Sequence, residues 1–248
     1  MRKEPDITHF SFGTCMHLVT PSTTACHAPA ACSSLPRTPP CHASVAILQS
    51  SAEQYGLYMW PSSLVLAQYV WRQRDSLCGT SVVELGSGTG LPGILAAKLG
   101  AHVSLTDAES KPEVLANLRS ICAINNVTCQ VSALSWGDCV LTNILPLSSV
   151  TNSNVSDFLI LGADVLYSSE AFEPLLATVH AILHRGGPGS RFVTAYQWRS
   201  GHRSIEFLLQ KWGMKVVSLR DGAELMPQKD HDSLNGAPIL LVELTLML

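Results

Sequence analysis

The chain has 248 residues, 46% of them hydrophobic, which suits one globular domain with a sizeable core, or such a domain with extensions. Its formal net charge of −3 shows no basic surplus, so direct binding of DNA or RNA is not expected. The charged start MRKEPD precedes no apolar run, and no stretch of about 18 apolar residues occurs, so we expect neither a secretory signal nor a membrane span.

Residues 1–50 differ in composition from the rest of the chain. The segment Thr20–Ser44 is rich in Ser, Thr, Pro and Ala, almost uncharged, and shows no helical or strand period. We therefore predict a mostly disordered extension over residues 1–50 and one folded domain over residues 51–248. Without an export signal, the eight cysteines are predicted to be reduced thiols. Their spacings, with those of nearby histidines, match no zinc motif, so no metal site is predicted.

Residues 51–248 alternate between predicted helices and strands. A helix starts at Pro61, and later helices cover the residues after Leu91, about 111–124, Glu170–His184 and His202–Trp212. Predicted strands are Ser81–Leu85, His102–Thr106, Cys129–Ala133, Asp157–Asp164, Arg191–Tyr196, Met214–Leu219 and Ile239–Leu246. This alternation predicts an α/β fold with a doubly wound, mainly parallel sheet, whose ligands bind at the carboxyl ends of the strands.

A glycine-rich turn, Glu84-Leu-Gly86-Ser87-Gly88-Thr-Gly90, follows the first of these strands. Glycines let the chain turn sharply, so that a ligand can approach the backbone and the amides at the start of the next helix. The dinucleotide fingerprint Gly-x-Gly-x-x-Gly is not met, because its last position is Leu91. A dehydrogenase is therefore disfavoured, although a nucleoside-like ligand is still indicated.

Three further side chains stand at the predicted strand ends. Asp107 ends the second strand, where a carboxylate accepts both hydroxyls of a ribose; a solvated loop aspartate is the alternative. Trp136 follows the third strand, where an indole can cover an adenine or simply belong to the core. Glu84 lies at the end of a buried strand and needs partners, such as amides of the glycine loop or the amino-acid end of the ligand.

The ordered set of motifs resembles the seven-stranded S-adenosylmethionine-dependent methyltransferases, and among them the methyltransferase-like family sixteen of protein methyltransferases. The resemblance rests on YMWP before the core, Glu-x-Gly-x-Gly-x-Gly, Trp136, and Asp164-Val-Leu-Tyr167 after the fourth strand, and it covers roughly residues 54–220. It implies a Rossmann-like sheet of seven strands with an antiparallel last strand, and S-adenosylmethionine as cofactor. The implied cofactor-binding residues are Trp60, Glu84, Gly86, Ser87, Gly88, Asp107, Trp136 and Ala163.

The resemblance also implies a pair of strands leading into the core. In this chain only Ile7–Phe12 and Val45–Leu48 are suitable, and the Ser/Thr/Pro/Cys-rich stretch separates them.

Asp164 and Tyr167 are the predicted catalytic residues. Methyl transfer from a sulfonium needs alignment of donor and acceptor and an uncharged lone pair on the acceptor nitrogen. Asp164 is placed to bind a guanidinium or an ammonium, and Tyr167 and Tyr196 would wall the acceptor channel. Capping of the following helix is the alternative role for Asp164.

The resemblance implies a protein substrate, with arginine in histones as the expected acceptor and lysine as the alternative. It also suggests chaperone or chromatin partners and a location in nucleus and cytoplasm. A non-catalytic module that binds S-adenosylmethionine and docks on partners, with Arg199, His202 and Arg203 as a docking edge, is the hypothesis from a different class.

Overall fold

The computed structural model describes residues 6–13, 40–51, 55–137, 156–198, 205–234 and 238–247. In this part of the chain no helix combines the length and the apolar composition that a membrane crossing requires. The docking edge predicted at Arg199, His202 and Arg203 lies outside the described residues.

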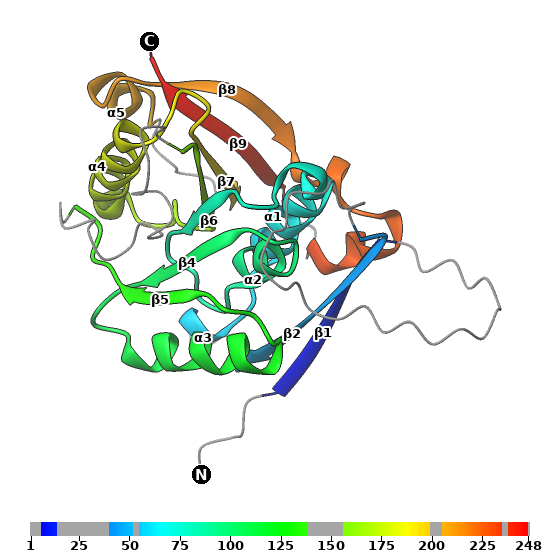
Figure 1. Ribbon diagram of the computed structural model, residues 1–248. Helices are drawn as coiled ribbons and strands as arrows, with labels where there is room; N and C mark the ends of the chain where they lie inside the picture. Colours follow the sequence, from blue (N-terminus) through cyan, green and yellow to red (C-terminus); the bar gives the residue numbers. More distant parts are fainter. Residues whose placement is uncertain are drawn as a thin grey trace, which may run out of the picture.

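A seven-stranded sheet forms the centre of the molecule (Figure 1). Its order is β5-β4-β3-β6-β7-β9-β8, and β3 to β7 pair in parallel while β9 runs antiparallel between β7 and β8. The predicted fold class, including the antiparallel last strand, is thereby confirmed. The strands are β3 (Ser81–Glu84), β4 (His102–Asp107), β5 (Gln130–Ala133), β6 (Phe158–Ala163), β7 (Arg191–Gln197), β8 (Met214–Asp221) and β9 (Ile239–Leu246).

The helices cover both faces of the sheet, as a parallel sheet with two buried faces requires. On one face, α1 (Pro61–Arg72), α2 (Leu91–Lys98) and α3 (Pro112–Ile124) share a buried cluster with Val82. On the other, α4 (Ser169–Arg185) and α5 (Glu206–Lys211) pack with Val83. The alternation of Val82 and Val83 follows from the two-residue period of a strand. Short 3-10 turns complete the chain: η1 (Tyr55–Leu57), η2 (Arg74–Ser76), η4 (Gly222–Leu225) and η5 (Gln228–Leu234).

The two segments expected to lead into the core do pair with each other. β1 (Asp6–Gly13) and β2 (His42–Gln49) form an antiparallel ladder in which Phe10 lies opposite Val45. Phe12, Val45 and Ile47 are fully buried in the cluster that contains α1, α2 and α3. The two strands therefore contribute these side chains to the core, whereas the disorder predicted between them falls on residues outside the described ones.

The sheet reverses its direction of growth between β3 and β6. From β3 the chain adds β4 and then β5 on one side, and it returns to place β6 on the other side of β3. Such a switch point leaves a crevice at the carboxyl ends of the two central strands. The glycine loop follows β3 and Asp164 follows β6, so the two predicted motifs flank this switch point.

Candidate active site

The glycine loop after β3 has a backbone that only glycine adopts easily. Gly86, Gly88 and Gly90 have φ angles of 59°, 53° and 69°. A Cβ at Gly90 would lie 2.7 Å from a methyl carbon of Leu118, so a side chain is also excluded by packing. These conformations turn the chain sharply at the end of β3 and lead into α2, which begins at Leu91.

Asp107 and Ser87 join the glycine loop to the end of β4. The amide of Gly88 donates to Oδ2 of Asp107 at 2.9 Å, and the amide of Ala108 donates to Oδ1 at 2.8 Å. The Ser87 amide donates to the Thr106 carbonyl at 2.8 Å, and the Thr106 amide donates to Ser87 Oγ at 3.0 Å. Each Asp107 oxygen keeps lone pairs for further donors, such as two ribose hydroxyls. Burial raises the pKa of Asp107, while its two amide donors lower it.

Glu84 lies beneath the loop and is only 1% exposed. Its Oε2 accepts the amide of Gly93 in the first turn of α2 at 3.0 Å, but its Oε1 has no partner among the described residues. Burial raises the pKa of Glu84 to about 8, and the negative charge of Asp107 adds to the rise. A buried carboxyl oxygen without a partner is costly, and a cationic ligand beside the loop would compensate for it.

The indole of Trp136 lies against the glycine loop. A Cβ at Gly86 would be 3.1 Å from the Trp136 ring and 3.1 Å from Val165, which follows Asp164. The loop after β3, the residue after β5 and the segment after β6 therefore converge at one place. Trp136 also packs against the core under α4, which is one of its two predicted roles.

Trp60 approaches the site from the residues before α1. The carbonyl oxygen of Gly56 would lie 3.4 Å from a Cβ on Gly88, which places η1 beside the glycine loop. The ring of Tyr55 stacks on that of Trp60 with centroids 5.8 Å apart, and the Trp60 indole N–H donates to the Tyr55 carbonyl. Tyr55 was not among the site residues predicted from the sequence. The aromatic residues of YGLYMW were the signal that could have indicated it.

Asp164 has an unusual backbone conformation. Its φ of 53° is left-handed, which is costly for a residue other than glycine and is typical of functional sites. Its amide donates to the Ala195 carbonyl, and its Oδ1 accepts the amide of Gln197 at the end of β7. Helix α4 begins only at Ser169, and its N-cap residue Ser168 makes no side-chain cap bond, so Asp164 is not the cap of α4.

The other residues predicted for the acceptor side lie on β6, on β7 and on the turn before α4. Tyr167 is 60% exposed on the turn before α4. Tyr196 is half-buried on β7, and burial raises its pKa. Ala163 ends β6 opposite Ala195 of β7. The site therefore has a backbone-lined half at β3 and β4 and a half formed by side chains at β6 and β7.

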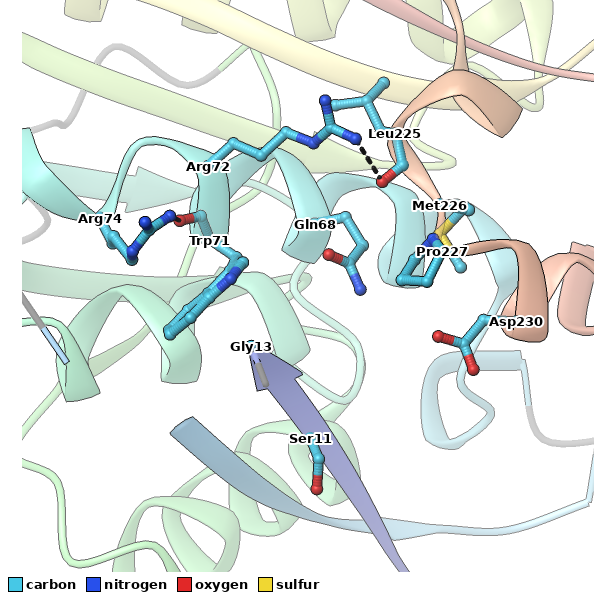
Figure 2. Close-up of a pocket in the computed structure, with 10 residues that line it drawn as sticks. All are labelled: Ser11, Gly13, Gln68, Trp71, Arg72, Arg74, Leu225, Met226, Pro227 and Asp230. Atoms are coloured by element: carbon cyan, nitrogen blue, oxygen red, sulfur yellow. Dashed lines mark hydrogen bonds between the residues drawn. The ribbon is translucent and has the colours of Figure 1, made fainter. Parts of the chain in front are cut away.

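A pocket of about 400 Å³ lies elsewhere, between the end of β1, the last turns of α1, and η4 and η5 (Figure 2). None of the predicted site residues lines it. Arg72 donates to the carbonyls of Glu224 and Leu225, and Arg74 donates to that of Trp71 and lies over its ring at 5.0 Å. These arginines thus hold structural contacts, and we assign the pocket no ligand.

Comparisons with known proteins agree with this geometry. A family model described as lysine methyltransferase matches residues 42–211. The histone-arginine methyltransferase METTL23 of Xenopus laevis is 42% identical over 167 residues, which cover 67% of this chain and 68% of that protein. Its human counterpart is 41% identical over 164 residues, covering 66% and 82%. The protein N-lysine methyltransferase METTL21A of Xenopus tropicalis is 39% identical over 122 residues, covering 48% and 52%.

Among solved structures, an S-adenosylmethionine-dependent methyltransferase from Clostridium acetobutylicum has the same fold. It superimposes with a TM-score of 0.51 at 10% identity, covering 75% of this chain and 91% of that one. At this identity the likeness bears on the fold alone.

Proposed function

The chain belongs to the lysine methyltransferase family and is an S-adenosylmethionine-dependent methyltransferase, and on this premise we propose that it methylates arginine side chains of proteins, histones among them. Asp164 carries the proposal. Its left-handed backbone and the hydrogen bond from the amide of Gln197 hold its carboxylate at the carboxyl end of β6. The next residue, Val165, lies beside Gly86, so Asp164 is close to the glycine loop. The resemblance to METTL23 supports arginine as the acceptor.

The residues on the β3 and β4 side fit the cofactor. Asp107 would accept the ribose hydroxyls, the loop around Gly86, Ser87 and Gly88 would contact the ligand through its backbone, and Trp136 would cover the adenine. Trp60 and Ala163 would complete this half of the site, and the unpartnered Oε1 of Glu84 could accept a hydrogen bond from the ammonium group of the amino-acid end. Bound there, S-adenosylmethionine supplies a methyl group on a positively charged sulfur that is a good leaving group.

On the acceptor side, the carboxylate of Asp164 would bind the guanidinium by charge-assisted hydrogen bonds and turn one nitrogen towards the methyl group. A guanidinium stays protonated at neutral pH, so its nitrogen becomes a nucleophile only if a proton is lost as attack proceeds. Asp164 would receive that proton. Tyr167 and Tyr196 would flank the acceptor and limit its approach to one direction.

Lysine is the second candidate acceptor, because the family is described by lysine methylation and METTL21A is among its relatives. A carboxylate flanked by two tyrosines would hold an ammonium as well as a guanidinium. A histone acceptor would place the enzyme in the nucleus as well as the cytoplasm, and chromatin proteins or chaperones would be its partners.

The test is transfer of a radiolabelled methyl group from S-adenosylmethionine to histones and to a cell extract. Wild type is compared with Asp164→Asn and with Glu170→Gln, an exposed carboxylate in the first turn of α4 that serves as the matched control. We expect a labelled protein band with wild type and the control variant only. Acid hydrolysis of that band then identifies methylarginine or methyllysine.

Methyllysine alone would overturn the arginine assignment. If neither the histones nor the extract were labelled while calorimetry still showed binding of S-adenosylmethionine, the proposed enzyme activity would be wrong and the non-catalytic docking module would be favoured.

A further inference from the structure

Two cysteines from different elements meet where α3 ends and β5 begins. Cys122 is buried in the last turn of α3, and Cys129 is half-buried immediately before β5. The two thiols are hydrogen-bonded to each other. They are separated by the turn 123–128, in which Asn126 has a left-handed φ of 53°. In Figure 1 this turn lies between the carboxyl end of α3 and the adjoining β5.

The turn between the two cysteines is held from several directions. Asn125 bonds both backbone groups of Ala46 on β2, at 2.9 Å and 2.6 Å, and also the carbonyl of Ile121. The amide of Val127 donates to the carbonyl of Cys122 at 3.1 Å, and Lys98 donates to the carbonyl of Asn125. The thiols are thus neighbours because the surrounding fold holds them together.

The hydrogen bond between the two thiols couples their titrations: it favours a thiolate on one sulfur and raises the pKa of the other, and burial adds to the rise. Since the thiolate is the reactive form of cysteine, one sulfur of the pair can attack an oxidant and the other can resolve the intermediate. Cys129 is the more accessible of the two, so a small oxidant reaches the pair from its side.

We propose that Cys122 and Cys129 form a reversible dithiol–disulfide couple, a modification site oxidised by hydrogen peroxide. The thiolate of one cysteine attacks a peroxide oxygen, the O–O bond breaks, and hydroxide leaves and takes up a proton to become water. The resulting sulfenic acid is then attacked by the sulfur of the other cysteine, which forms the S–S bond and releases a second water. Two thiols and one peroxide thus yield one disulfide and two waters, and a thiol reductant restores both thiols.

The disulfide would link the end of α3 covalently to the start of β5, around the residue that anchors β2. It closes a short loop in the unfolded chain and so restricts the unfolded state. Since the native turn is already held by Asn125, the oxidised protein is expected to unfold at a higher urea concentration than the reduced one.

The experiment uses the full chain, titrated with hydrogen peroxide, alkylated and mapped by peptide mass spectrometry. We expect the peptides of Cys122 and Cys129 to be joined and protected from alkylation, and to separate again after dithiothreitol. Cys129→Ser should abolish both the crosslink and the peroxide-dependent rise in the urea midpoint. Cys78→Ser, at an exposed cysteine outside this turn, is the matched control and should keep both.

The proposal is overturned if Cys122 and Cys129 remain open to alkylation at peroxide concentrations that oxidise the exposed Cys41 and Cys78. Crosslinks that join either cysteine to a third one instead would also overturn it. Should Cys129→Ser fail to fold, the peptide map of the wild-type protein decides the question alone.

Discussion

The two halves of the candidate active site are built in different ways. At β3 and β4, the polar side chains are hydrogen-bonded to backbone amides: Asp107 accepts that of Gly88, Ser87 that of Thr106, and Glu84 that of Gly93 in α2. Ser87 and Glu84 are 7% and 1% exposed. At β6 and β7, the side chains of the proposed acceptor side are less buried: Asp164 and Tyr196 are half-buried, and Tyr167 is 60% exposed. The first half suits the small ligand that we propose for it, and the second is more open, as the proposed macromolecular acceptor would require.

This contrast is tested most strongly by Asp164→Asn. Asparagine tolerates the left-handed conformation, and its side-chain oxygen can still accept the amide of Gln197, so the fold should be kept. Turnover should fall by roughly 10²–10⁴-fold, the usual contribution of a positioned proton acceptor. Binding of S-adenosylmethionine should not change. Rate measurements with calorimetry separate the two quantities, and a parallel loss of cofactor affinity would mean that the halves are not independent.

Asp107→Asn acts on the opposite half. The amide group would replace an oxygen that now accepts a backbone N–H from Gly88 or Ala108, and the negative charge facing a ribose would be lost. Hydrogen bonds to a charged group contribute about 1.5–3 kcal/mol, so affinity for S-adenosylmethionine should fall roughly 10–100-fold. Calorimetry with the exposed Glu109→Gln as control checks this. If the affinity for S-adenosylmethionine were unchanged, Asp107 would not bind the cofactor.

Glu84→Gln tests how strongly the first half of the site depends on pH. Folding raises the pKa of Glu84 from an ordinary 4.5 to about 8, so the folded state binds this proton more tightly than the unfolded state. Protonated Glu84 therefore contributes fully to the free energy of unfolding at low pH. This contribution is lost as the pH rises from 4.5 to about 8, by up to about 1.4 kcal/mol per pH unit. Urea unfolding at several pH values should show this decline in wild type and in the exposed Glu224→Gln, but not in Glu84→Gln. If the stability of Glu84→Gln still declined with pH, titratable groups other than Glu84 would be the cause.

The smallest effect is expected at Tyr167. A cation–π contact at an exposed ring contributes about 0.5–1 kcal/mol, so Tyr167→Ala should raise KM for a protein acceptor roughly 2–5-fold. Tyr167→Phe keeps the ring and should behave as wild type. Initial rates over a range of acceptor concentrations give both values. A large fall in kcat for Tyr167→Phe would instead indicate a chemical role for its hydroxyl.

The element order and the sheet could be predicted from local patterns. The predicted bounds of β9 agree with the observed ones, and those of β3, β4, β5 and β6 agree to within one or two residues, because apolar runs bounded by glycines and charges mark buried strands. The placement of Asp107 and Asp164 at one edge follows from the parallel direction of β4 and β6. The hydrogen-bond partner of Asp164 could not be predicted from the sequence, because it is the amide of Gln197, which lies far along the chain.

What the sequence alone determined is therefore the set of strands, the glycine turn and the carboxylates at the strand ends, all of which depend on neighbouring residues. The tertiary structure decided how β1 and β2 pack over the helices, how Tyr55 stacks on Trp60, and that Cys122 meets Cys129. The physical reason is the same in each case. These contacts form only when the core packs, and packing selects side chains by shape and distance. Spacing along the chain brings Tyr55 near Trp60 and Cys122 near Cys129, but it does not decide whether their side chains touch.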